Sequence, residues 1–269
     1  MPASSSDARP ADSWSDDLTA CAGLVERGDA ARFRAVMAAP LPARRALFPL
    51  YAFNIEVSRA PWVTQEPMIA EMRLQWWRDA LEEIGKGTGI RRHEVVTPLS
   101  QALTPEGVAA LDALVEARRW DIWKEPFDDL AHFRGYIDAT AAGLLRAGAG
   151  MLGAALPDQV AADAGFALGL AAWFRAIPAL EASGRMPLPD GRDSAVAALA
   201  AEALDRLAAA RRARASVPRA AAPLLFGLPE AAMVLTLARA EPGRVKDGAL
   251  DPAPLAQRLA LLRASFGRW

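Results

Sequence analysis

Residues 165–184, GFALGLAAWFRAIPALEASG, constrain the fold more than any other segment, because a helix over this stretch would be apolar nearly all round. A helix at the surface of a globular protein keeps a polar face toward water, whereas a helix without such a face has to be surrounded by other apolar elements. β-branched residues, which would favour a strand, do not accumulate here. The segment therefore predicts a central helix inside a bundle of helices.

The rest of the chain shows the same helical pattern. Apolar residues recur at steps of three and four, Ala and Leu dominate, and Pro and Gly interrupt the pattern at ordinary helix lengths. We expect one all-α domain over residues 13–269, preceded by a disordered lead at 1–12. The predicted helices cover about 13–27, 29–38, 42–60, 66–85, 104–124, 127–155, 158–182, 193–216, 219–239 and 252–267.

Composition narrows the classes of function. Lys and Arg number 31 and Asp and Glu 32, so the net charge is -1 and no basic footprint for nucleic acid is present. Cys21 is the one cysteine, so an intrachain disulfide is excluded and a reducing compartment is the simple inference. We expect Cys21 to be an inert buried thiol. No run of about 18 apolar residues is present. We expect a cytoplasmic protein without a transmembrane segment, and peripheral contact with the inner membrane stays open.

The stretch 136–156, YIDATAAGLLRAGAGMLGAAL, is rich in small residues. Small residues let two helices approach closely, and they can also leave room between helices for an elongated apolar ligand. Both interpretations remain open at this point, with close packing of helices as the simpler of the two.

Four segments resemble the squalene/phytoene synthase family and keep that family's order and rough spacing. The LYAF tetrapeptide at the start of a helix and the GR-x-x-LP turn at Gly184–Pro189 are its most specific parts. The matching text is ARRALFPLYAFNIEVSR (43–59), EPMIAEMRLQWWRDALEEI (66–84), ARRWDIWKEPFDDLAHFRGYIDATAAGLL (117–145) and GFALGLAAWFRAIPALEASGRMPLPDGR (165–192).

The resemblance implies an isoprenoid-synthase-like helical bundle with a central cavity. Active members of the family join two prenyl diphosphates head to head, and Mg²⁺ neutralises the departing diphosphate. Mg²⁺ prefers oxygen ligands, and the spacing D-x-x-x-D places two carboxylates on one face of a helix. Two helices of this kind face each other across the cavity and hold the metal and the diphosphate.

Neither acidic motif is present where the resemblance places it. Aligned on LYAF, the first pair of acidic positions falls on Ser58 and Trp62, and counting back from Gly184 puts the second pair on Ala176 and Leu180. None of these four residues carries a carboxylate. We therefore expect no catalytic residue and no metal site, and we expect Trp62 and Leu180 to plug or line the former diphosphate end.

A divergent branch of the family lacks the acidic motifs and includes the mitochondrial assembly factor of respiratory complex I. The text EPM…RLQWWRDAL at 66–81 is similar to that branch. The resemblance thus implies a pseudoenzyme without a cofactor that helps to assemble a respiratory complex and contacts its subunits. Two alternatives stay open. One is a prenyltransferase with displaced acids that uses Mg²⁺, and the other is a protein that binds a prenyl lipid without turnover.

Basic side chains near the cavity mouth bind diphosphate in the family, and Arg suits bidentate contacts with phosphate. By this resemblance the candidate ligand-binding residues are Arg44, Arg45, Arg175 and Arg185, together with Tyr51 of the LYAF tetrapeptide.

Arg175 is the most informative of these residues because it lies on the otherwise apolar central helix. The alternative to ligand binding is an internal ion pair, for which Glu56, Glu71 and Asp138 are the candidate partners.

Two further clusters allow a functional and a structural interpretation. The first cluster comprises Arg73, Trp76, Trp77 and Asp79. It is either a patch that touches a ligand or partner, or a pair of packed Trp side chains beside a surface ion-pair network. The second is either a metal site or the acidic start of a new helix after Pro126; it comprises Asp121, Glu125, Asp128, Asp129 and His132.

Overall fold

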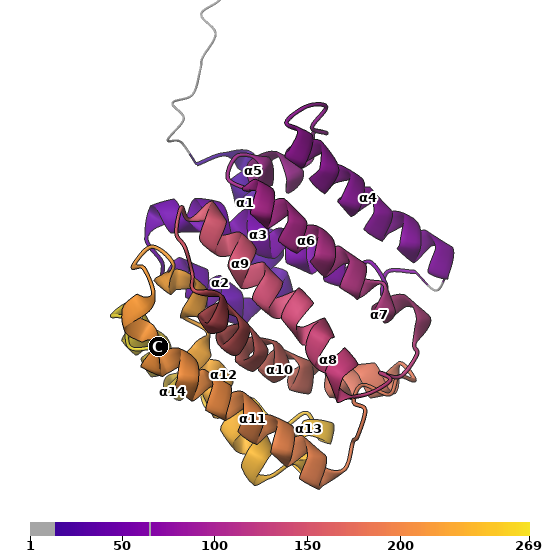
Figure 1. The fold of residues 1–269 in the computed structure, drawn as a ribbon, viewed down its shortest axis with the longest axis vertical. Helices are drawn as coiled ribbons and strands as arrows, with labels where there is room; N and C mark the ends of the chain where they lie inside the picture. Colours follow the sequence, from indigo (N-terminus) through magenta and orange to yellow (C-terminus); the bar gives the residue numbers. More distant parts are fainter. Residues whose placement is uncertain (1–13, 65) are drawn as a thin grey trace, which may run out of the picture.

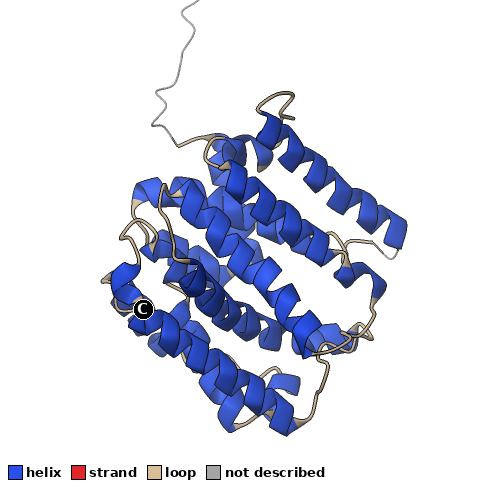
Figure 2. Ribbon diagram, in the orientation of Figure 1, coloured by secondary structure: helices blue, strands red, loops and turns tan. Residues whose placement is uncertain are grey.

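The computed structural model describes residues 14–64 and 66–269, which form a bundle of helices without a strand (Figures 1 and 2). The expected all-α architecture is confirmed, while the predicted lead at 1–12 lies outside the described residues. The first part of the bundle contains α1 (Asp16–Gly28), α2 (Ala30–Met37), α3 (Leu41–Arg59), α4 (Pro67–Lys86), α5 (Val96–Ser100), α6 (Pro105–Arg118) and α7 (Trp120–Trp123). The second part contains α8 (Leu130–Ile137), α9 (Gly143–Met151), α10 (Asp158–Ala182), α11 (Asp193–Arg212), α12 (Leu228–Ala240), α13 (Gly243–Lys246) and α14 (Pro254–Ser265).

Side-chain caps fix where several helices begin. Ser15, Asp29, Thr104 and Asp129 each accept a hydrogen bond from the backbone N–H three residues further on. Such caps satisfy backbone donors that have no partner inside the helix and contribute about 1 kcal/mol each. Asp129 confirms the prediction that an acid of the second cluster starts the helix after Pro126.

Helix α10 is the central helix, as its apolar composition predicts. It packs against α8, α9, α11, α12 and α13, and Figure 1 shows it between α9 and the pair formed by α11 and α12. Phe166, Leu170 and Phe174 are fully buried along it. Pro178 lies within the helix without ending it, since α10 continues to Ala182.

Small residues let α10 approach the segment between α8 and α9 very closely. This segment, Asp138–Ala142, forms a π-helical turn. A Cβ atom added at Gly165 would lie 2.5 Å from the backbone Cα of Ala142, and one added at Gly169 would lie 2.8 Å from the side chain of Ile137. Close packing of helices therefore explains part of the small-residue stretch. Ala141 of the same turn lines a cavity, so both interpretations hold for neighbouring residues.

The structure departs from the predicted boundaries in five places. The helix predicted over 219–239 begins only at Leu228, after a 3-10 turn at Ala222–Leu225. The helix predicted over 104–124 is divided into α6 and α7, and the one predicted over 127–155 is divided by the π-helical turn. The loops predicted over 85–98 and 240–254 contain the short helices α5 and α13. A helix of four or five residues is too short to show apolar periodicity, which is why the sequence pattern does not reveal it.

The expectation that no segment is apolar enough to cross a bilayer is wrong by composition. Among the described residues, Asp158–Ala182 and Ala222–Ala240 are long and apolar enough. In Asp158–Ala182, however, 67% of the most apolar window is buried inside the bundle, as expected for a central helix. The length and composition of these two segments are therefore weak evidence for a membrane span.

Cys21 is fully buried, and its Sγ donates a hydrogen bond to the carbonyl of Glu94 at 3.3 Å. Burial raises the pKa of the thiol to about 12. The reactive thiolate is therefore scarce at pH 8, and access is blocked as well. We expect a thiol reagent such as 5,5′-dithiobis(2-nitrobenzoate) to leave the native protein unmodified at pH 8 and to modify one thiol per chain in guanidinium chloride. Equal reaction rates in both conditions would show that Cys21 is exposed.

Candidate functional site

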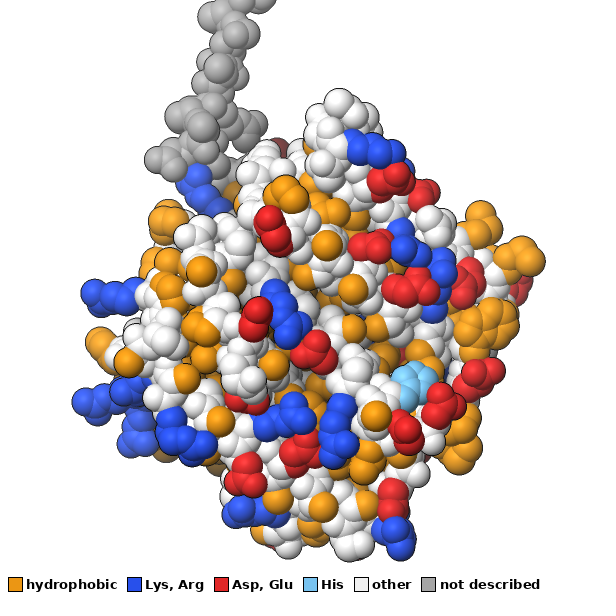
Figure 3. Space-filling view, viewed as in Figure 1, with side chains coloured by type: hydrophobic (Ala, Val, Ile, Leu, Met, Phe, Trp, Pro, Cys, Tyr) orange, Lys and Arg blue, Asp and Glu red, His pale blue; other side chains and the backbone are white. Residues whose placement is uncertain are grey.

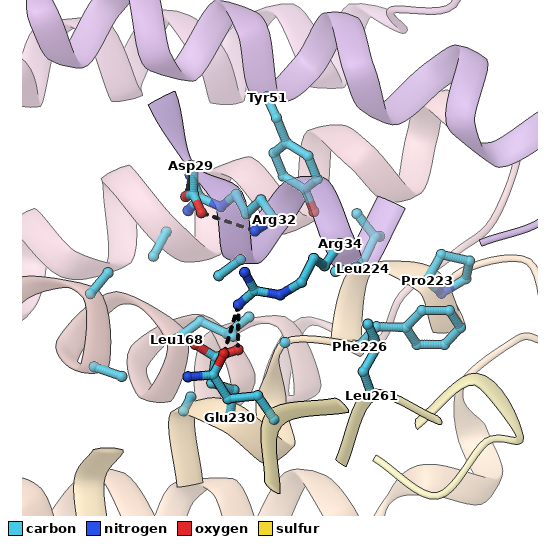
Figure 4. Close-up of a pocket in the computed structure, with 18 of the residues that line it drawn as sticks. Asp29, Arg32, Arg34, Tyr51, Leu168, Pro223, Leu224, Phe226, Glu230 and Leu261 are labelled. Carbon is cyan, nitrogen blue, oxygen red and sulfur yellow. Dashed lines mark hydrogen bonds and ion pairs between the residues drawn. The ribbon is translucent and has the colours of Figure 1, made fainter. Parts of the chain in front are cut away.

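A cavity of about 260 Å³, partly open to solvent, lies beside the central helix. Apolar side chains from α9, α10 and the C-terminal part of the chain form most of its wall (Figure 4). The apolar lining residues include Leu144, Leu145, Leu168, Ala171, Pro223, Leu224, Phe226 and Leu261.

A polar network closes one side of this cavity. The Glu230 carboxylate pairs with Arg34 at 3.5 Å (Figure 4). It also accepts from Arg175 at 2.9 Å. Arg34 donates in addition to the side-chain oxygen of Gln257 at 2.9 Å, and Arg175 pairs with Asp251 at 3.2 Å. The network therefore joins helices α2, α10, α12 and α14, and it places cations and an acid beside an apolar chamber.

Tyr51 lines the same cavity from α3. The Arg32 guanidinium lies over its ring at 5.1 Å, and Arg32 also pairs with Asp29 at 3.5 Å. Burial raises the pKa of the Tyr51 hydroxyl to about 12, so the hydroxyl stays protonated at neutral pH and can act as a hydrogen-bond donor.

The candidate ligand-binding residues are divided between different places. Tyr51 and Arg175 come together at the cavity. Arg44 donates from Nε to the carbonyl of Ala39 at 2.8 Å, and neither Arg44 nor Arg45 is among the residues that line the cavity. Arg185 lies at another surface, described below.

Sequence reasoning missed the other polar residues of the cavity, which are Asp29, Arg32, Arg34, Glu230, Gln257 and Arg258. Arg34 and Glu230 are 196 residues apart in the chain. No local pattern links residues at such a distance, and only the packing of α12 and α14 against the first helices brings them together.

The proposed partners of Arg175 were wrong. Glu71 pairs with Arg119 at 3.2 Å and Asp138 with Arg146 at 3.1 Å, so each of these acids already neutralises another arginine. Arg175 pairs instead with Glu230 and Asp251, as described above. The alternative of an internal ion pair is correct in kind, although the ion pair lies at the edge of the cavity.

The four positions predicted to have lost their acids hold side chains without a carboxylate. The Ser58 hydroxyl donates to the carbonyl of Ile55 at 2.9 Å within α3. Ala176 packs against the apolar core, and Leu180 is buried in it. Trp62 keeps 44% of its surface exposed and lines a shallow cavity of about 90 Å³, whereas Leu180 is not among the residues that line it. That these two residues plug or line the former diphosphate end stays a prediction.

Arg185 brings the ends of α3 and α10 together at this shallow cavity. Its guanidinium lies 5.1 Å from the Trp62 ring and 5.6 Å from the Trp120 ring. Arg185 is buried, and its Nε and Nη1 atoms have no hydrogen-bond acceptor among the described residues. Burial lowers its pKa from the ordinary value for an arginine. Cation–π contacts with Trp62 and Trp120 stabilise this cation, and the charge of Asp121 acts in the same direction.

Exposed apolar side chains surround the shallow cavity. They belong to the loop after α3, to the N-terminal end of α4, to α7 and to the turn after α10, and Figure 3 shows orange side chains gathered at that edge of the molecule. We name this the Trp62 surface, and it comprises Trp62, Val63, Met68, Ile69, Met72, Trp123 and Met186. Contiguous exposed apolar area of this kind is typical of an interaction site.

The acidic cluster that suggested a metal site is dispersed in the structure. Asp121 is buried and binds the Tyr136 hydroxyl at 2.9 Å and Arg118 at 3.0 Å. Asp128 and His132 lie at the surface, 3.1 Å apart. Among residues 14–64 and 66–269 no group of three or more His, Cys, Asp or Glu side chains is arranged to hold a metal ion.

The Trp76 and Trp77 cluster is partly buried and partly open to solvent, and its contact with a ligand or partner stays a prediction. Trp77 is buried and packs edge-on against Phe53, as the structural interpretation requires. Trp76 is only half-buried, and Arg91 lies over its ring at 4.8 Å. Together with Glu56, Arg73 and His93 both Trp side chains line an open cavity of about 170 Å³.

Comparison with known proteins identifies the family. A model of the squalene/phytoene synthase family matches residues 25–192. The assembly factor 6 homolog of NADH dehydrogenase (ubiquinone) complex I from Drosophila melanogaster is 31% identical over 180 residues, which cover 63% of this chain and 52% of that protein. The chain thus spans about half the length of that relative.

Solved structures share the fold at low sequence identity. A dehydrosqualene synthase in complex with a ligand superposes with a TM-score of 0.72 and 12% identity, covering 92% of this chain and 95% of that one. The squalene synthase HpnC from Alicyclobacillus acidocaldarius gives a TM-score of 0.69 and 18% identity, covering 84% and 94%. With more than half of its length matched by the family model, this chain belongs to the squalene/phytoene synthase family.

Proposed function

We propose that this chain is a non-catalytic member of its family that acts as an assembly factor for a respiratory NADH dehydrogenase. The relative from Drosophila melanogaster that carries the name of a complex I assembly factor supports this direction. Respiratory complex subunits are then the expected partners, and a cytoplasmic location with peripheral contact to the inner membrane remains our prediction.

The observation that carries this proposal is the set of side chains where the metal-binding acids of active relatives are expected. A Mg²⁺–diphosphate cluster needs oxygen ligands from both facing helices. The hydroxyl of Ser58 is used within its own helix, and Trp62, Ala176 and Leu180 offer no oxygen at all. The side chains at these four positions therefore do not fit Mg²⁺.

The Trp62 surface supplies what an assembly factor requires, which is an exposed apolar area for a protein partner. Aromatic residues and Met are enriched in the cores of protein interfaces, and an Arg inside such a patch adds a directional contact. The buried Arg185 guanidinium lies 5.1 Å from the exposed Trp62 ring and supports it from beneath.

Gene deletion followed by measurement of assembled NADH:quinone oxidoreductase on native gels tests the assembly role. We expect the amount of assembled complex to fall several-fold, and wild-type protein to restore it. Met68→Gln/Met72→Gln, which changes two exposed residues of the Trp62 surface, should restore it poorly. The matched control Leu41→Gln/Ile90→Gln changes two exposed apolar residues elsewhere and should restore it fully. Normal complex levels in the deletion strain would contradict the assembly role.

A second candidate function is the binding of a prenyl lipid without turnover, and the cavity beside the central helix favours it. The cavity combines an apolar wall with Arg175, Arg34 and Tyr51 at one side, which suits an apolar chain with an anionic head. Native mass spectrometry of the purified protein with added farnesyl diphosphate checks this candidate. We expect one bound molecule per chain in the wild type and loss of binding when Ala171→Trp fills the cavity. Absence of any bound lipid in the wild type would exclude it.

A further inference from the structure

Helix α14 carries a regular apolar stripe that faces away from the bundle. At about 100° per residue, three leucines of the helix and the Phe that caps its C-terminal end fall within an arc of about 60° on one side of the helix. These are Leu255, Leu259, Leu262 and Phe266, and between 49% and 77% of their surface is exposed. Most amphipathic helices of a globular protein turn such a stripe toward the core.

The opposite side of α14 fixes the helix in this orientation. Ala264 is fully buried, and α14 packs against α12. The Gln257 side chain accepts from Arg34 of α2 at 2.9 Å and donates to the carbonyl of Pro252 at 2.8 Å. These contacts hold the inner side of α14 against the bundle, which leaves the apolar stripe exposed on the outer side. Turning the stripe inward would break them.

The charged residues in the segment that carries the stripe all have one sign. Arg258 and Arg263 flank it on either side, and Arg268 follows the helix. From residue 254 to 268 the sequence contains no Asp or Glu, although the whole chain has a net charge of -1. None of these three arginines forms an ion pair within the described part of the chain. Figure 3 shows Lys and Arg side chains gathered near the C-terminal end.

An exposed apolar stripe bordered by unpaired arginines has the composition of a helix that lies in a membrane interface. Such helices insert their apolar side between the lipid headgroups, and their basic residues contact anionic headgroups. We propose that α14 docks this protein on the surface of an anionic phospholipid bilayer. A second copy of the chain is the other conceivable occupant, and the experiment below separates it from a bilayer.

Docking through α14 would also bring the cavity beside the central helix to the bilayer. Gln257, Arg258 and Leu261 of the same helix line that cavity. The outer side of α14 would therefore face the membrane while its inner side lines the cavity. A lipid that moves from the bilayer into the cavity would pass only the thickness of this helix. The membrane proposal does not depend on the assembly role, because it rests on the exposed stripe and its charges alone.

Cosedimentation of the full chain with vesicles tests this proposal. We expect the wild type to bind vesicles of phosphatidylcholine and phosphatidylglycerol in a ratio of 7:3, and to bind much more weakly to pure phosphatidylcholine or in 0.5 M NaCl. Leu259→Gln/Phe266→Gln should weaken the partition coefficient at least about tenfold, since both side chains lose their apolar contact with the interface. Arg263→Gln/Arg268→Gln should reduce binding to the anionic vesicles only.

The control variant Met68→Gln/Met72→Gln changes two exposed apolar residues of the Trp62 surface and should bind vesicles like the wild type. Circular dichroism should show equal helix content in all variants, because the substituted side chains are exposed. Wild-type protein that stays in the supernatant with anionic vesicles would overturn the proposal, as would equal loss of binding in the control variant. A wild-type dimer in light scattering that Leu259→Gln/Phe266→Gln converts to a monomer would assign the stripe to a second copy instead.

Discussion

Replacing Asp121 with alanine is expected to lower the free energy of unfolding by about 3 kcal/mol, because it removes one partner from a buried charged network. Asp121 keeps only 2% of its surface exposed. Its carboxylate accepts from the Tyr136 hydroxyl at 2.9 Å and from Arg118 at 3.0 Å, and Arg118 donates to Tyr136 at 2.6 Å. Without the carboxylate, a buried guanidinium would lose its counter-charge and a buried hydroxyl would lose its acceptor.

Urea unfolding followed by circular dichroism measures this effect. Asp128→Ala serves as the matched control, because the Asp128 side chain is 87% exposed, and it should change the stability by less than about 0.5 kcal/mol. Asp121→Asn keeps an acceptor oxygen but loses the charge, so it should fall between the wild type and Asp121→Ala. A loss below about 1 kcal/mol for Asp121→Ala would show that water replaces the carboxylate in this network.

Gly165→Ala should destabilise the protein by about 3 kcal/mol, although alanine is the better helix former. The added Cβ would meet Cα, Cβ and N of Ala142 at 2.5 to 2.7 Å. Two of these are backbone atoms of the π-helical turn, so α10 and the turn would have to move apart. That displacement would loosen the contact between the central helix and its closest neighbour, with a cost typical of overpacking in a core.

Gly135→Ala in α8 is the matched control, since no heavy atom lies within 4 Å of the added Cβ. This substitution should stabilise the protein by up to about 1 kcal/mol through helix propensity alone. Thermal unfolding of the two variants beside the wild type provides the comparison. Equal effects of the two substitutions would mean that the contact between Gly165 and Ala142 is not tight.

Most of the fold could be predicted from the sequence because its signals are local. The apolar composition of residues 165–184 gives the central position of α10, and a capping acid gives the start of α8 at Asp129. Apolar periodicity fails only where an element is very short, as in α5 and α13, or where the helix changes its winding, as in the π-helical turn at Asp138–Ala142.

The candidate site could be predicted only in part, because its polar network joins distant segments. Tyr51 and Arg175 stand out in the sequence, one in a family tetrapeptide and the other as a lone cation on an apolar helix. Glu230 and Gln257, which hold Arg175 and Arg34 in place, lie in the C-terminal part of the chain beyond the segments that resemble the family. Charge pairing across such distances depends on tertiary packing, which no periodicity encodes.

The Trp62 surface and the stripe on α14 could not be predicted either. An apolar periodic helix is expected to turn its apolar side inward, so Leu255, Leu259 and Leu262 read as core residues. Only the structure shows that Ala264 occupies the inner side and that the leucines face outward. These two exposed surfaces are where we propose that the chain contacts a protein partner and a bilayer.

Incubation of the purified chain with farnesyl or geranylgeranyl diphosphate and Mg²⁺ tests most directly whether this synthase frame has lost its metal-dependent reaction. With Ser58, Trp62, Ala176 and Leu180 at the positions of the metal-binding acids, we expect pyrophosphate release no faster than in the control without protein, beside an active squalene synthase as positive control. Mg²⁺-dependent release of pyrophosphate with formation of a hydrocarbon product would contradict the proposal of a non-catalytic protein.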